Sequence, residues 1–96
     1  MSRHARRIDA NQPVIVAALR EVGCHVLHLH AVGGGCPDLL VLRRGQLHLL
    51  EVKDPTVKRW AKKSNELAQQ ALRDAGWPVH VVTSVDEALA AIGVRS

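Results

Sequence analysis

Two apolar segments separated by only two residues constrain the fold of this 96-residue chain more than any other feature. The segments are Asp38–Arg43 and Gln46–Lys53, and Arg44-Gly45 lies between them. So short a connection joins antiparallel strands, because parallel strands need a long crossover. Both segments carry apolar residues on both faces, which is typical of central strands that are covered on two sides. The sequence therefore predicts a hairpin at the centre of a sheet.

Helix and strand patterns on either side of the hairpin predict an α/β fold. Five further elements are predicted from apolar spacing and from the residues at their ends: a helix capped by Asp9 and stopped by Gly23, a strand over Cys24–Ala31, a helix over Leu67–Ala75 closed by Gly76, a strand over Val79–Thr83, and a helix opened by a capping box that starts at Ser84. The element order is α-β-β-β-α-β-α. We expect a single domain over residues 9–96, preceded by a loose basic arm over residues 1–8.

Charge and composition narrow the possible partners. The chain has 13 Lys and Arg against 9 Asp and Glu, a net charge of +4. This balance favours a polyanionic partner such as nucleic acid, although a generally basic proteome explains it equally well. The sequence has no apolar run near the roughly 20 residues of a membrane span, and its Arg-rich start lacks the apolar stretch of a signal peptide. We therefore expect a cytoplasmic protein with no membrane partner and no organic cofactor.

The hairpin register gathers charged residues at one end of the two strands. Folding through Arg44-Gly45 places Asp38 opposite Glu51, and strand alternation puts Lys53 on the face of Glu51. Two carboxylates so placed attract a cation, and their hard oxygens suit Mg²⁺ or Mn²⁺. The grouping suits phosphodiester hydrolysis, in which the metal activates a water and Lys53 orients that water or stabilises developing negative charge. A slip of one residue would separate Asp38 from Glu51.

A purely structural role is the alternative for the same residues. Glu51 and Lys53 would then form a solvated ion pair, and Asp38 would be a turn residue after Pro37. Two features favour catalysis. The charged residues lie at the ends of strands that are predicted to be buried. In addition, Gly33–Gly35 leads directly into Asp38, which gives a backbone that a substrate can approach closely. A catalytically silent DNA-binding module remains the alternative function.

These residues resemble the core of the PD-(D/E)XK nucleases. Gly35-Cys36-Pro37-Asp38 followed by Glu51-Val52-Lys53 is similar in particular to the small virus-type replication-repair nuclease (VRR-NUC) domains. The resemblance implies a restriction-endonuclease-like fold with a central mixed sheet flanked by helices. It also implies a metal-dependent endonuclease for branched or flapped DNA in phage-type replication, repair or recombination, such as a homodimeric Holliday-junction resolvase. Asp38 and Glu51 would bind the metal, the Val52 carbonyl would add a ligand, and Lys53 would be the catalytic lysine.

Two positions depart from the family pattern. Many nucleases of this superfamily have a first-helix Glu that faces the metal, and Gln12 falls near that place. Gln12 would either hold a metal-bound water or complete a capping box with Asp9. The family's Leu-Thr-x-x-Gln segment is replaced by Ala61-Lys62-Lys63-Ser64-Asn65. Asn65 would either take the place of the glutamine or help to cap the helix.

Cationic residues are concentrated just after the predicted site. Four Lys and Arg residues within six positions predict a stripe that follows DNA phosphates: Lys58, Arg59, Lys62 and Lys63. Asn65 is a further predicted DNA contact, and Arg7 either reaches DNA or belongs to a loose tail. Trp60 stacks on an unpaired base or, as we favour, packs in the core. A zinc site is not favoured, because no paired ligand spacing links four candidate ligands: Cys24, His28, His30 and Cys36.

Overall fold

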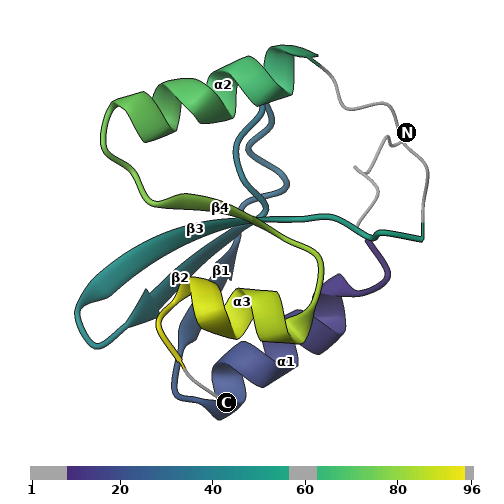
Figure 1. Cartoon of the computed structure of the whole chain (residues 1–96), viewed down its shortest axis with the longest axis vertical. Coiled ribbons are helices and arrows are strands. Elements are labelled where there is room, and N and C mark those ends of the chain that lie inside the picture. Colours follow the sequence, from purple (N-terminus) through teal and green to yellow (C-terminus); the bar gives the residue numbers. More distant parts are fainter. Residues whose placement is uncertain (1–8, 57–62, 95–96) are drawn as a thin grey trace.

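The computed structural model, which describes residues 9–56 and 63–94, has a four-stranded sheet with helices on both faces (Figure 1). The elements follow the predicted order: α1 (Gln12–Glu21), β1 (His25–His28), β2 (Leu39–Arg43), β3 (Gln46–Val52), α2 (Lys63–Asp74), β4 (Val79–Val82) and α3 (Val85–Ala91). The expected fold class, α/β with a central mixed sheet, is confirmed. None of the helices in the described ranges is long and apolar enough to cross a membrane.

The sheet has the strand order β1-β2-β3-β4, so the hairpin strands are central as predicted. The β1–β2 and β2–β3 pairs are antiparallel and the β3–β4 pair is parallel. In the hairpin, Arg43 pairs with Gln46 and Leu39 pairs with Leu50, which is the predicted register. Both turn residues have positive φ, 49° at Arg44 and 77° at Gly45, as a tight two-residue hairpin turn requires. Asp38 directly precedes the Leu39–Leu50 pair, which brings it to the level of Glu51.

The two faces of the sheet are covered differently. Helices α1 and α3 lie on one face and α2 lies on the other (Figure 1). The main core is under α1 and α3, and its largest fully buried side chains include Ile15, Leu19, Leu39, Leu50 and Val52. Because side chains alternate along a strand, Glu51 and Lys53 point away from this core and toward α2.

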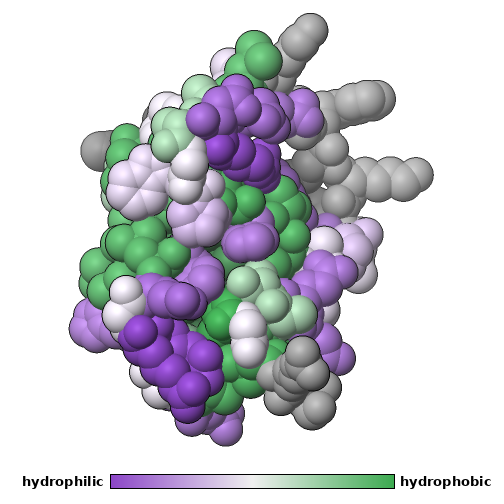
Figure 2. Space-filling model, turned by 60° about the vertical axis from the view of Figure 1, so that its left-hand side comes forward, coloured by the Kyte–Doolittle hydropathy of each residue, from purple (hydrophilic) through white to green (hydrophobic). Residues whose placement is uncertain are grey.

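Most of the surface in Figure 2 interleaves hydrophilic and hydrophobic side chains. The exposed apolar residues include Val81 on β4, of which 50% is exposed, and Trp77 in the connection from α2 to β4. Single exposed apolar side chains are ordinary on a small protein surface. Val81 of β4 is therefore an accessible apolar residue beside α2.

The start of α1 differs from the predicted capping box. The N-cap is Asn11 rather than Asp9, and the Asn11 side chain does not cap the helix. The Asp9 carbonyl accepts a hydrogen bond from the Gln12 N–H (2.9 Å), so the Asp9–Gln12 capping box is wrong. The Asn11 side chain instead donates from Nδ2 to the carbonyls of Lys53 and Thr83, 3.0 Å away in each case. A contact between the start of α1 and the ends of β3 and β4 thus replaces a local cap.

The start of α2 also differs from its prediction. The helix begins at Lys63, four residues before the predicted Leu67, so Asn65 lies within it and does not cap it.

The remaining element ends are close to their predicted positions. The strand expected over Cys24–Ala31 is shorter, His25–His28, because the chain turns into the glycine loop. The capping box of α3 is confirmed, since Ser84 Oγ accepts from the Glu87 N–H (3.1 Å). Glu87 Oε1 in turn accepts from the Thr83 N–H at 2.7 Å. This hydrogen bond is the largest cause that lowers the pKa of Glu87 below its ordinary value, and the Thr83 hydroxyl adds to the effect.

Candidate active site

The end of the hairpin holds Asp38 in a fixed orientation beside β3. Its Oδ2 accepts a hydrogen bond from the Val52 N–H at 2.7 Å, and its carbonyl accepts one from the Leu29 N–H at 2.8 Å. The first contact places the Asp38 carboxylate against the peptide that joins Glu51 to Val52. The predicted proximity of Asp38 to this segment of β3 is therefore present in the structure.

Glu51 is a buried carboxylate, with 8% of the residue exposed, and both of its oxygens have partners. Oε2 lies 3.2 Å from Lys53 Nζ, and Oε1 accepts a hydrogen bond from Gln69 Nε2 at 3.0 Å. The Lys53 side chain is 46% exposed. Burial of a carboxylate is unfavourable unless cations or donors compensate its charge, and here Lys53 and Gln69 do so. The Glu51 carboxylate can attract a cation, and the accessible Lys53 ammonium can stabilise a negatively charged substrate.

Gln69 is the site residue that the sequence analysis missed. It lies on α2, is 6% exposed, and donates from Nε2 to the Gly35 carbonyl (3.2 Å) as well as to Glu51. It therefore joins α2, the glycine loop and β3 at the candidate site. The sequence signal that could have identified Gln69 is its spacing from Asn65. Gln69 follows Asn65 by one helical turn and therefore lies on the same face of α2.

Gly35 shows what the glycine run does in this fold. Its φ is +81°, and a Cβ at this position would lie 2.8 Å from the Ala68 Cβ and 3.0 Å from the Asn65 Cα. The close approach expected at the glycines is therefore made by α2. Asn65 lies beside the glycine loop, on the helix face that looks toward Glu51.

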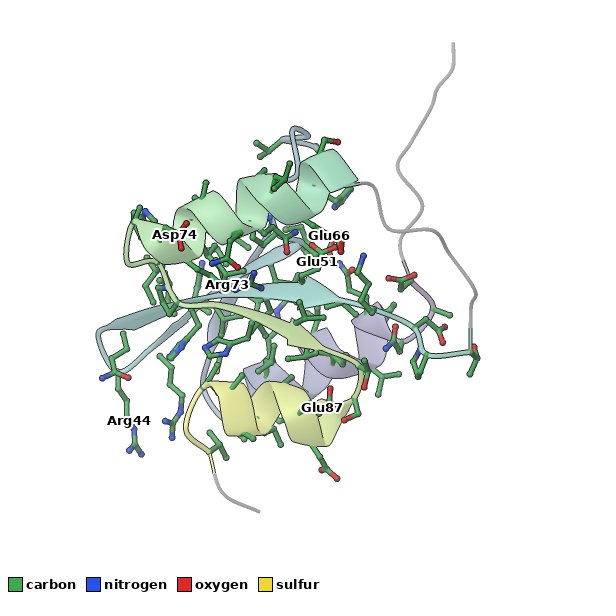
Figure 3. The ribbon with its side chains drawn as sticks, turned by 45° about the horizontal axis from the view of Figure 1, so that its top comes forward. Arg44, Glu51, Glu66, Arg73, Asp74 and Glu87 are labelled. Atoms are coloured by element: carbon green, nitrogen blue, oxygen red, sulfur yellow. The ribbon has the colours of Figure 1, made fainter. Side chains whose placement is uncertain are left out.

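A cleft of about 380 Å³ opens between α2 and the sheet. Figure 3 shows Glu51, Glu66 and Arg73 in the space between the two layers. The cleft is lined by residues of β3, α2 and β4: Glu51, Lys53, Asn65, Glu66, Gln69, Gln70, Arg73 and Val81. Two residues that the sequence analysis assigned to catalysis, Glu51 and Lys53, thus share one cavity with the predicted DNA contact Asn65.

Gln12 occupies a different position from the cleft. It is 2% exposed and lines a separate cavity of about 270 Å³ with Val16, Arg20 and His28, among others. Its Nε2 atom is buried, and within the described ranges it has no hydrogen-bond partner. A buried amide nitrogen without an acceptor is unusual and calls for an explanation.

The other predicted contacts are only partly described. Lys63 is the first residue of α2. Lys58, Arg59, Lys62, Arg7 and the aromatic Trp60 lie outside the described residues. Among residues 9–56 and 63–94, no three or more His, Cys, Asp or Glu side chains are grouped so that they could hold a metal ion.

The similarity to known proteins is found among solved structures. No family model matches the chain, and no curated protein matches it. A solved structure described as a VRR_NUC domain superposes with a TM-score of 0.65 and 27% sequence identity. The match covers 88% of this chain and 96% of the other, so the similarity includes nearly the whole of both. The chain therefore shares the fold of a VRR-NUC domain, which is the PD-(D/E)XK nuclease fold, and this similarity supports a nuclease domain of that type.

Proposed function

We propose that this nuclease domain is a metal-dependent DNA endonuclease whose catalytic residues are Asp38, Glu51 and Lys53, assisted by Gln12. The observation that supports the proposal is the position of Asp38 and of the Glu51–Lys53 pair at the same end of the hairpin. Asp38 Oδ2 is hydrogen-bonded to the Val52 N–H, and Glu51 is paired with Lys53. These residues also form the motif that resembles the VRR-NUC pattern, and the fold likeness supports the same assignment.

The donor atoms at this site fit Mg²⁺ or Mn²⁺. Asp38 and Glu51 offer carboxylate oxygens, and the Val52 carbonyl offers a third oxygen. Mg²⁺ commonly takes one or two protein carboxylates and completes its coordination with waters and substrate phosphates, so a third acidic side chain is not needed. When bound, such an ion polarises the phosphate and makes a water more acidic.

The remaining residues act on the substrate and on water. Lys53, whose side chain is 46% exposed, stabilises the negative charge that develops on the phosphate. Gln12 would hold a water through its buried Nε2, which has no hydrogen-bond partner within the described ranges. From the sequence we further expect Asn65 and Arg7 to contact DNA, and four cationic residues to bind its phosphates: Lys58, Arg59, Lys62 and Lys63.

We propose branched or flapped DNA as the substrate, in phage-type replication, repair or recombination. A homodimer that places two such sites on one four-way junction suits Holliday-junction resolution. Size-exclusion chromatography with light scattering tests the dimer, and a monomer bound to the junction would contradict it.

A cleavage panel tests the proposed activity. Four-way junction, flap, nicked and linear duplex DNA are incubated with Mg²⁺, with Mn²⁺ and with EDTA. We expect cleavage of a branched substrate only with a divalent ion, and a loss of about 100-fold or more in Asp38→Asn, Glu51→Gln and Lys53→Ala. Glu21→Gln, an exposed carboxylate at the end of α1, is the matched control and retains activity. DNA binding without cleavage under any divalent ion would support the catalytically silent module instead.

A further inference from the structure

Arg73 is a cation held in place in the cleft between α2 and the sheet, at the end away from Glu51. Its Nε donates to the Val79 carbonyl at 3.1 Å, which ties the guanidinium to the start of β4. The residue is half-buried between α2 and the sheet. Figure 3 shows Glu51 and Glu66 toward one end of α2 and Arg73 toward the other. The neighbouring acid, Asp74, accepts a hydrogen bond from Gln70 through its Oδ1 (2.9 Å).

The charge of Arg73 is not compensated within the described residues. No carboxylate there lies within ion-pair distance of it, whereas Lys53, the other cation of the cleft, is paired with Glu51. A half-buried guanidinium without a counter-ion is unfavourable unless an anion binds to it. Its terminal N–H groups form a planar fork that matches two phosphate oxygens, and the hydrogen bond from Nε has already ordered the side chain.

The strand register relates Arg73 to the catalytic residues. Arg73 is anchored to Val79, which pairs with Leu49, while Glu51 pairs with Val81. Val79 and Val81 are two residues apart on β4, a distance of about 7 Å along the strand. A phosphate on Arg73 would therefore belong to a nucleotide close to the one that is cleaved at Glu51.

The size and lining of the cleft indicate a single strand. A volume of about 380 Å³ lies near the lower end of the range for small-molecule pockets, about 300–1,000 Å³. This suffices for a nucleotide and is too small to enclose a duplex. The half-exposed Val81 offers an apolar surface to a base or sugar, and the amides of Asn65 and Gln70 offer hydrogen-bonding groups.

We propose that Arg73 forms a phosphate-binding subsite for an unpaired strand of DNA, one that runs along the cleft between α2 and β4 away from Glu51. The inference rests on the proposed function and extends it to a substrate class, DNA with a single-stranded segment beside the cleaved bond.

Binding without cleavage tests the subsite independently of the nuclease activity. Fluorescence anisotropy in EDTA measures affinity for a single-stranded oligonucleotide, a flap and a blunt duplex over a range of salt concentrations. In Arg73→Gln we expect single-strand and flap binding to weaken about 5- to 20-fold. The salt slope, which is the slope of log K against log salt concentration, is expected to fall in magnitude by about 0.7 for the single strand, the value for one lost phosphate contact. Blunt-duplex binding is expected to change less than twofold.

Two variants serve as controls for this measurement. Arg44→Gln removes the same charge from the exposed hairpin turn, on the side of the sheet away from α2 (Figure 3), and is expected to leave single-strand binding unchanged. Arg73→Lys keeps the charge but loses the fork, so an intermediate affinity is expected. Equal weakening by Arg44→Gln and Arg73→Gln, or an unchanged salt slope in Arg73→Gln, would overturn the subsite.

A measurement on the unmodified protein covers the case in which Arg73→Gln does not fold. A 5′-phosphorylated dinucleotide is titrated in EDTA while the Arg73 Nε–H signal is followed by NMR. A saturable shift of this signal, with the Arg44 signal unmoved, supports the subsite, and an unmoved Arg73 signal contradicts it. Loss of Mg²⁺-dependent cleavage in the panel would refute the nuclease proposal without changing either binding result.

Discussion

Gln69 is the residue that fixes the orientation of Glu51. We expect Gln69→Leu to destabilise the protein by about 1–3 kcal/mol, because a buried carboxylate oxygen and the Gly35 carbonyl both lose their donor. Cleavage is expected to fall as well, since Glu51 then keeps only its ion pair with Lys53. Urea unfolding gives the stability change. The matched control for stability is Gln70→Leu, an exposed neighbour, and a similar loss of stability in both variants would contradict the special role of Gln69.

Gly35 combines a left-handed backbone with a close helix contact, and the two effects can be separated. Gly35→Ala places a Cβ 2.8 Å from the Ala68 Cβ at a φ of +81°, while Gly34→Ala meets no atom within 4 Å at a φ of +64°. We expect Gly34→Ala to cost about 1 kcal/mol from its backbone conformation alone. Gly35→Ala should cost about 1–3 kcal/mol more because α2 must move. Urea unfolding of both variants measures this difference, and equal losses would show that α2 does not press on Gly35.

The position of the three charged candidate residues could be predicted from the sequence, because they lie at the ends of apolar strands. Asp38, Glu51 and Lys53 follow from a register that two turn residues fix. Gln69 could not be found in this way. A glutamine on an amphipathic helix is expected on the solvent face, and only the packing of α2 against the glycine loop turns it inward.

At the scale of elements, the hairpin was predictable and the start of α1 was not. Strand alternation and a two-residue turn are local signals, so they define β2 and β3 and the register between them. The partners of Asn11 are 42 and 72 residues away in sequence, at Lys53 and Thr83. A local pattern cannot reveal such contacts, and the capping motif at Asp9 was therefore misread.

The Asn11 contact makes a prediction about how α1 is joined to the sheet. In Asn11→Asp the donor Nδ2 is replaced by a carboxylate oxygen, which repels the carbonyls of Lys53 and Thr83. We expect a loss of about 2–4 kcal/mol, more than in Asn11→Ala, which removes the hydrogen bonds without adding repulsion. Urea unfolding at pH 7 compares the two variants. An Asp variant as stable as the Ala variant would mean that the carboxylate is not held against the two carbonyls, which would contradict this contact.

At the scale of the whole molecule, the fold class and the central position of the hairpin could be predicted, but the cleft could not. Element order and apolar faces determine which segments form the sheet and which helices cover it. The cleft depends on how far α2 stands from β4, and this distance is set by contacts such as Gly35–Ala68 and Arg73–Val79. Those contacts join residues without a common sequence signal, which is why the Arg73 subsite emerges only from the structure.

The stability of the whole fold is expected to depend on pH through His48. This residue lies on the α1/α3 side of the sheet, with both ring nitrogens buried and, within the described ranges, without a hydrogen-bond partner. Burial lowers the pKa of His48 below its ordinary value of 6.5, and the charges of His80 and Arg43 lower it further. The His48–His80 ring centroids are 6.4 Å apart. The folded protein therefore favours neutral His48.

The sign of the effect follows from the lowered pKa. Above pH 6.5 both states hold neutral His48 and stability is at its full value. As the pH falls below 6.5 the unfolded chain binds a proton that the folded chain resists, so stability drops, by at most about 1.4 kcal/mol per pH unit. Urea unfolding between pH 8 and pH 5 measures the decline. His48→Leu should flatten it, whereas His25→Leu, at an exposed position of β1, should leave it unchanged. An equally steep decline in His48→Leu would assign the pH dependence to other groups.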